Sequence, residues 1–221
     1  MKIATTFVLV LALIFICISI PPTHVHTVMA NANTPPAGHT GAPSEGTCAG
    51  AGCHVGTGGT GGLVAAPATT AFQYQPGATD TIVVGLANLG SLRFGFEATA
   101  LLNNGSMAGS FANLPDMNTL IQSSGGKSYI SHTSNGATAP LDLADGTYWS
   151  PFPIGAGGWL FEWTAPPPGS GPVTFYVTGV AANGDELASA SDTSYVYSVM
   201  LTEQGTAVTP TTWGKIKQIY R

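Results

Sequence analysis

Arg93-Phe94-Gly95-Phe96-Glu97-Ala98-Thr99-Ala100-Leu101-Leu102, followed by Asn103-Asn104-Gly105, is the stretch that decides the fold. Apolar residues recur in it at every second position, which is the pattern of a β-strand with one face on a core. Asparagine and glycine then supply the backbone conformations of a tight turn. The stretch predicts a strand of an antiparallel sheet. Its core face holds four residues: Phe94, Phe96, Ala98 and Ala100.

Short runs of the same period lie on both sides of this strand, separated by Gly, Pro, Asn and Asp. In the run 158–164, three aromatic residues share one face and would fill much of an interior. The segment 114–126 predicts a loop or a short helical turn instead. Seven or eight antiparallel strands at this spacing predict an all-β fold, an immunoglobulin-like β-sandwich. The expected strands are 69–75, 81–87, 93–102, 106–112, 129–134, 158–164, 172–182 and 194–202.

The first 32 residues are typical of a secretory signal peptide. Lys2 precedes the apolar run 7–20, and Ala30-Asn31-Ala32 offers small residues for cleavage. That run has about 14 residues, whereas roughly 20 are needed to cross a bilayer, so cleavage is favoured over an uncleaved membrane anchor. Cys17 would be removed with it. We expect a secreted, periplasmic or cell-surface protein without a membrane span after cleavage.

The low content of charged residues limits the kinds of binding partner that we expect. Charged residues make up 8% of the chain and the formal net charge is −5, whereas globular proteins usually contain about 25% charged residues. Lysine and arginine form no patch of the kind that binds phosphates, which excludes nucleic acid as an expected partner. A redox partner or a component of the cell surface is expected instead.

Three parts follow the signal peptide. Residues 33–62 are rich in Gly and Pro and form an extended segment with a Cys/His motif, and residues 63–203 form the sandwich domain. Residues 204–221 are a tail in which Thr212 caps a short C-terminal helix. That helix either packs on the sandwich or serves as a sorting or docking tag, and the sequence leaves both open.

The motif Cys48-Ala49-Gly50-Ala51-Gly52-Cys53-His54 contains both cysteines that remain after export. Two thiols followed at once by an imidazole suit a disulfide, a metal site, or a covalently attached c-type haem with His54 as an axial ligand. Haem explains all three side chains, and it ranks first. Positive φ angles at Gly50 and Gly52 would let the residues between the cysteines bulge.

A second axial ligand would come from elsewhere in the chain. His132, on the predicted strand 129–134, is the best candidate, although a lone histidine is more often satisfied by a hydrogen bond. His39 is the alternative, with Met107 and Met117 behind it. The proposed haem c site is therefore Cys48, Cys53, His54 and His132.

Other chemistries remain open. A Cys48–Cys53 disulfide suits an oxidising compartment and a non-enzymatic surface or adhesion module. Zinc or copper ranks third, because structural zinc sites usually draw on two such motifs and the chain has one. Asp185, Glu186 and Asp192 are a weak calcium candidate. Neither a Gly-x-Ser-x-Gly turn nor a phosphate loop occurs, so we expect no enzymatic activity.

Several segments together resemble the bacterial choice-of-anchor V family, which is related to the Reeler domains at the N-terminus of reelin. The resemblance covers nearly all of the chain after the signal peptide, except the tail. It implies an exported β-sandwich with an anchoring or sorting signal, and many members carry Cys-x-x-Cys-His at this position. Here four residues separate the cysteines instead of two. The matching segments are 40–54, 94–100, 129–133, 161–166, 171–176 and 181–184.

Overall fold

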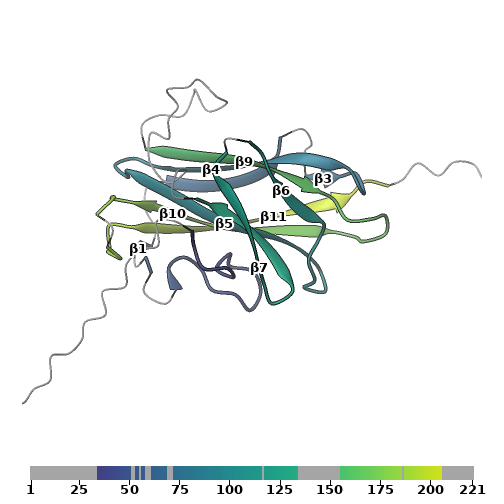
Figure 1. Cartoon of the computed structure of the whole chain (residues 1–221), viewed down its shortest axis with the longest axis horizontal. Coiled ribbons are helices and arrows are strands. Elements are labelled where there is room, and N and C mark those ends of the chain that lie inside the picture. The colour runs from purple at the N-terminus through teal and green to yellow at the C-terminus, as the bar shows by residue number, and fades with distance from the viewer. Residues whose placement is uncertain are drawn as a thin grey trace, which may run out of the picture.

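The computed structural model describes residues 34–50, 53–54, 56–57, 61–68, 72–115, 117–133, 155–185 and 187–205. Strands dominate these residues, and they form two sheets that face each other as a sandwich (Figure 1). The predicted signal peptide, most of the aromatic segment 137–156 and all but the first residues of the tail lie outside the described residues. In the part that is described, no helix has the length and hydropathy needed to cross a bilayer.

The larger sheet has the order β1-β11-β10-β5-β8-β7, and β3 adds to β11 beyond this path. The smaller sheet has the order β2-β4-β9-β6. Strands of the larger sheet are β1 Gly56–Thr57, β3 Gln73–Tyr74, β5 Arg93–Leu102, β7 Thr119–Ser124, β8 Lys127–His132, β10 Val173–Ala182 and β11 Thr193–Glu203. Strands of the smaller sheet are β2 Gly61–Pro67, β4 Thr79–Asn88, β6 Ser110–Asn113 and β9 Ala156–Thr164.

The core lies between the sheets and follows the predicted alternation. On β5 the four residues of the expected core face are each 1% exposed or less. Opposite them, β9 buries Trp159, Phe161 and Trp163. The Phe96 and Trp159 rings lie 4.7 Å apart between centroids, a distance typical of packed aromatic pairs. The expected β-sandwich is therefore confirmed.

The structure corrects several strand predictions. The run 69–75 contributes only the two residues of β3, and the preceding β2 was not predicted. The segment 114–126 contains β7, which pairs with β8 through a two-residue turn at Gly125-Gly126. Both glycines have positive φ, as such hairpin turns require. The short strands β1 and β3 pair with β11 in parallel, so the larger sheet is mixed rather than purely antiparallel.

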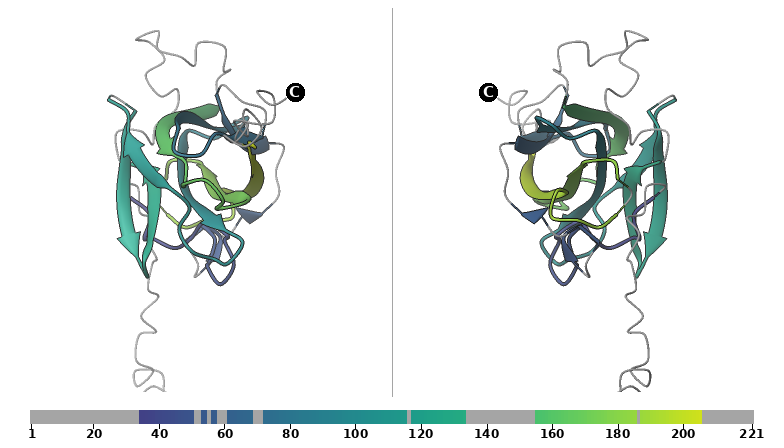
Figure 2. Two further views of the ribbon diagram at one scale, coloured as in Figure 1. Left: turned by 90° about the vertical axis from the view of Figure 1, so that its right-hand side faces the viewer. Right: turned by 90° about the vertical axis from the view of Figure 1, so that its left-hand side faces the viewer.

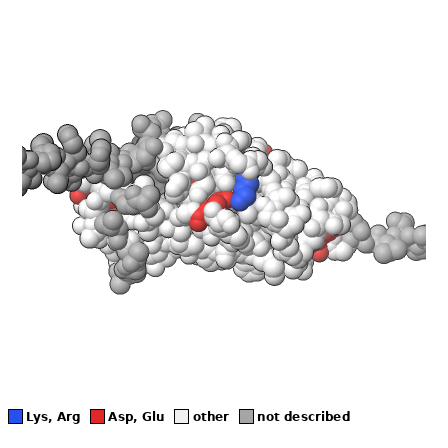
Figure 3. Space-filling model, turned by 90° about the horizontal axis from the view of Figure 1, so that it is seen from below, with Lys and Arg blue, Asp and Glu red and all other residues white. Residues whose placement is uncertain are grey.

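The β7–β8 hairpin stands at one side of the molecule (teal in Figure 2). The face seen from below carries few charged groups, and a basic patch there lies directly beside an acidic one (Figure 3). Such a surface is expected from a chain with 8% charged residues.

Gly109 tests the packing of the aromatic core. It has positive φ, and a Cβ there would overlap the Thr164 carbonyl oxygen and lie 2.8 Å from Trp163 Nε1. Trp163 Nε1 donates to the Ala108 carbonyl at 2.9 Å, so the ring cannot move away without losing that bond. We expect Gly109→Ala to lower the free energy of unfolding by about 1–3 kcal/mol more than Gly105→Ala does.

Gly105 is the matched control, because it also has positive φ but has open space around its Cβ position. Chemical denaturation of both variants measures the difference. Equal losses of stability in the two variants would show that backbone strain alone is responsible.

Candidate functional site

The outer face of the larger sheet is covered by the segment that precedes β1. Along β5 and β10, polar residues alternate with the core residues and point away from the sandwich interior. Glu97, Thr99 and Thr178 on that face are all fully buried. The described N-terminal segment 34–50 runs beneath this sheet (purple in Figure 1) and forms its own β-bridge between Thr40 and Thr47. Residues 34–50 are thus held by docking on the sandwich.

Glu97 lies at the centre of the covered face. Its Oε2 accepts the backbone N–H of His39 at 2.6 Å. Its Oε1 has no partner among the described residues, and neither has Oγ1 of Thr178, which is opposite Glu97 in the sheet register. Burial raises the pKa of Glu97 to about 7, although backbone N–H groups of His39 and Gly38 oppose the rise. Near neutral pH this site therefore contains a carboxyl that ionises reluctantly.

Glu45 fastens the other end of the same segment to β8. Its Oε1 accepts from Lys127 Nζ at 2.7 Å and from Tyr129 Oη at 2.8 Å, and its Oε2 accepts from Thr40 Oγ1 at 2.6 Å. Burial would raise the pKa of Glu45, but the bonds from Lys127, Thr40 and Tyr129 outweigh it and hold the pKa below its ordinary value. Glu45 is therefore an ionised clamp between the segment and the sheet.

Two consecutive turns bring the cysteines together. Gly50 N donates to Thr47 O at 2.8 Å, and Cys53 N donates to Gly50 O at 3.2 Å. Gly50 is not among the residues with positive φ, so the expected left-handed bulge does not occur there. Gly52 lies outside the described residues.

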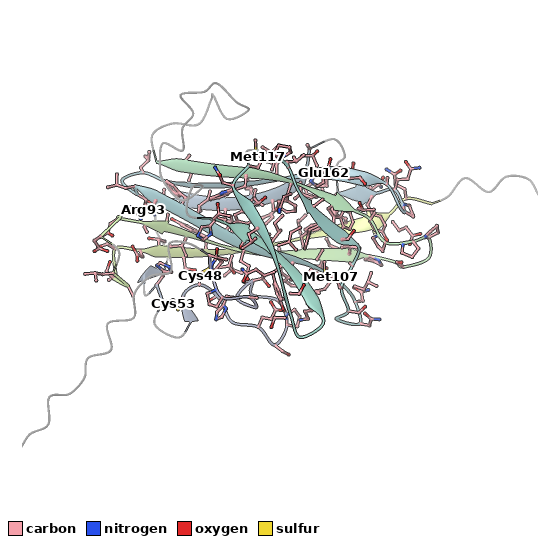
Figure 4. The ribbon with its side chains drawn as sticks, viewed as in Figure 1. Cys48, Cys53, Arg93, Met107, Met117 and Glu162 are labelled. Atoms are coloured by element: carbon pink, nitrogen blue, oxygen red, sulfur yellow. The ribbon has the colours of Figure 1, made fainter. Side chains whose placement is uncertain are left out.

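The thiols of Cys48 and Cys53 are free and partly buried, and they lie near one another below the larger sheet (Figure 4). Burial, together with the nearby Glu97 and Cys53, raises the pKa of Cys48 to about 12. A thiolate at Cys48 would add negative charge beside a buried carboxyl. Neutral forms of Cys48, whether thiol, thioether or disulfide, are therefore favoured at this position.

His54 is held by a residue far away in the sequence. Its Nδ1 lies 2.9 Å from Oδ2 of Asp192. Asp192 is 1% exposed, and its Oδ1 also accepts the backbone N–H of Asn183 at 3.3 Å. A carboxylate that accepts from Nδ1 leaves Nε2 of the imidazole with a lone pair, which is the usual arrangement of a metal-bound histidine.

His132 ends β8 and is held by backbone atoms of β5. The pairing of these strands stops at Glu97↔Ser131. Beyond it, Nδ1 of His132 lies 3.0 Å from Phe96 N and 3.1 Å from Phe96 O. The ring lies against Gly95, where a Cβ would be 2.6 Å from its Cε1. Burial lowers the pKa of His132, and the nearby His54 lowers it further.

The structure thus brings the proposed site residues into two neighbouring pairs. Cys48 lies near Cys53, and His132 lies near His54. His39, the alternative ligand, is in the docked segment, where its Nδ1 lies 2.8 Å from Pro36 O. The two methionines considered as ligands are away from the cysteines in Figure 4. Within the described ranges, no three His, Cys, Asp or Glu side chains converge so as to hold a metal ion.

Two residues of the candidate site were missed at the sequence level. Asp192 was considered only for calcium, together with Asp185, yet the structure places it against His54. Glu97 was treated as an outward-facing strand residue, yet it is fully buried. A buried acidic residue in a chain with so few charges is a signal that could have drawn attention to Glu97.

Comparison with known proteins gives similarities of fold. No family model matches the chain, and no curated protein matches it. The human F-spondin reeler domain is similar at 18% identity and a TM-score of 0.41, over 64% of this chain and 89% of that one. The Reelin-N domain of F-spondin is similar at 18% identity and a TM-score of 0.40, over 65% of this chain and 86% of that one. The major pilin SpaD of Corynebacterium diphtheriae is similar at 10% identity and a TM-score of 0.37, over 63% of this chain and 35% of that one.

The Glu45 clamp predicts a loss of stability in acid. Because its pKa in the folded protein is depressed, Glu45 stabilises the fold above the ordinary carboxyl pKa, and this contribution is lost as the pH falls through the folded-state pKa. We expect Glu45→Gln to lower the free energy of unfolding by about 1 kcal/mol at pH 7 and by less in acid. Denaturation curves measured from pH 7 downward test this.

The control for this experiment is Glu162→Gln, which removes one carboxylate from β9 in the smaller sheet. If the difference in the free energy of unfolding between wild type and the Glu45 variant stays constant down to strongly acidic pH, the proposed role of Glu45 as an ionised clamp is contradicted.

Glu97 predicts the opposite pH dependence. Its folded-state pKa is raised to about 7, so its contribution to stability is present in acid and is lost as the pH rises toward 7. Glu97→Gln cannot ionise, and its amide can donate toward Thr178 while its oxygen accepts from His39. We expect the variant to gain up to about 3 kcal/mol relative to wild type between pH 5 and pH 8. A relative stability that does not change with pH would rule this out.

Proposed function

We propose that the chain is an exported β-sandwich protein that carries a c-type haem on Cys48 and Cys53. In this proposal His54 and His132 are the axial ligands, and the protein transfers electrons or senses redox state or a small ligand at the cell surface. The signal-like residues 1–32 support export. A redox protein or a surface component is the expected partner.

The observation that carries the proposal is the contact between His54 and Asp192 beside the two cysteines. Nδ1 of His54 lies 2.9 Å from a buried carboxylate oxygen. Nδ1 of His132 lies 3.1 Å from the Phe96 carbonyl oxygen and 3.0 Å from the Phe96 backbone N–H, so its contacts are compatible with either tautomer. Carboxylates and backbone carbonyls are the usual partners of the second nitrogen of a histidine that binds iron or zinc. The two rings are also close enough for His54 to affect the pKa of His132.

The cysteines fit a thioether better than a thiolate. A zinc or copper site would require an anionic Cys48 beside buried Glu97, whereas thioether bonds leave both sulfur atoms uncharged. His54 follows Cys53 directly, so attachment there would also fix the backbone of the ligand. When bound, the haem supplies a one-electron redox centre whose potential depends on its axial ligands.

The protein would prepare this site before any cofactor arrives. Glu45 and Glu97 hold the segment 38–47 on the sheet, so the cysteines begin from a fixed position. Gly95 leaves room for the His132 ring beside β5. Because these contacts already order the segment, cofactor binding would cost less conformational entropy.

The test is expression of the full chain in a host that exports proteins and attaches c-type haem. We expect covalent haem by mass, a haemochrome spectrum and a low-spin iron with two nitrogen ligands. Replacing both cysteines by alanine should abolish covalent attachment. His132→Ala should keep the haem but convert it to a high-spin form, whereas the matched variant His39→Ala should leave the spectrum unchanged.

Absence of covalent haem from the wild-type chain would refute the proposal. Thiol counting with and without reductant would then test the alternative, a surface or adhesion module with a Cys48–Cys53 disulfide. A low-spin spectrum that survives His132→Ala but not His39→Ala would reassign the second ligand.

A further inference from the structure

Asp192 and His54 form the side-chain hydrogen bond of greatest sequence separation in the site, 138 residues apart. Asp192 lies in the turn that leads into β11 and is almost fully buried, with both carboxylate oxygens engaged. His54 is 15% exposed in its side chain. Asp192 therefore has its contacts within the protein, while His54 reaches the surface of the site.

Backbone pairing brings these two residues together. β1 pairs with β11 in parallel, with Gly56 opposite Thr193, the residue after Asp192. A Cβ at Gly56 would overlap the Asp192 carbonyl oxygen and would lie 2.7 Å from the Ala190 carbonyl oxygen. Because only glycine allows so close an approach, Gly56 determines whether His54 can reach Asp192.

We propose that Asp192 is a positioning residue that fixes the tautomer of His54. Its Oδ2 accepts a hydrogen bond from the Nδ1–H group, so Nε2 keeps its lone pair and faces away from Asp192 as a ligand atom. The negative charge of Asp192 also makes Nε2 a stronger electron donor, which stabilises an oxidised iron relative to a reduced one. The identity of the metal rests on the proposed function, whereas the tautomer does not.

The first experiment measures the tautomer in the full chain produced without haem. Nitrogen-15 NMR of the imidazole distinguishes a proton on Nδ1 from one on Nε2. We expect Nδ1–H at His54 in the wild type. In Asp192→Asn, the amide donates toward Nδ1, and we expect the proton to move to Nε2.

The matched control is Asp185→Asn, which removes a carboxylate from the same β10–β11 connection without touching His54. Its carboxylate accepts from Leu187 N and Asn183 Nδ2 on the surface, so the His54 tautomer should not change. Gly56→Ala is a second route, because it separates the two residues without altering either of them, and we expect it to lose the uniform Nδ1–H form.

The second experiment measures the reduction potential of the haem-loaded chain. We expect a higher potential in Asp192→Asn than in wild type, and no change in Asp185→Asn. An Nε2–H tautomer in wild type, or an Nδ1–H tautomer that persists in both Asp192→Asn and Gly56→Ala, would overturn the positioning role. Lack of covalent haem would instead refute the proposed function, and the tautomer result would still decide the role of Asp192.

Discussion

Burial of the Glu97 carboxyl in the outer face of the larger sheet is the constraint on which the site depends. A carboxyl removed from water needs hydrogen bonds, and the segment that crosses beneath the sheet donates the backbone N–H of His39 to Oε2. That contact and the Glu45 clamp together give a Gly- and Pro-rich stretch a defined place without a core of its own. The outer face of the larger sheet therefore holds the segment that leads to the cysteines.

This arrangement places the hydrophobic core and the candidate site on opposite faces of the larger sheet. The buried hydrophobic cluster between the sheets runs from Leu63 on β2 to Leu201 on β11, so none of its members belongs to the cysteine segment. The outer face of β5 has the opposite character, since it carries buried polar residues at alternate positions. One strand thus serves the core with one face and the site with the other, as the period of two requires.

Much of the fold was predictable from sequence, because strict alternation in β5 and β9 identifies the residues that face the core. β7 was missed because its side chains are mostly half-exposed, and the Gly125-Gly126 turn was the stronger signal. His132 was chosen as the partner of His54 from sequence, and this pairing stays a prediction; in the structure His54 lowers the pKa of His132. Asp192 was not identified as a partner of His54 from sequence, because the register of β1 on β11 depends on packing that no local pattern encodes.

The parallel pairing of β1 with β11 also affects the order in which the protein can assemble. Contacts between residues so distant in sequence form late, because the chain must close a long loop before they contribute. During synthesis, Cys48, Cys53 and His54 emerge well before Asp192 and β11. The contacts of the segment with Glu97 on β5 and with Lys127 on β8 do not need β11. Closure of β11 therefore adds the carboxylate partner of His54 to a segment that the earlier strands already hold.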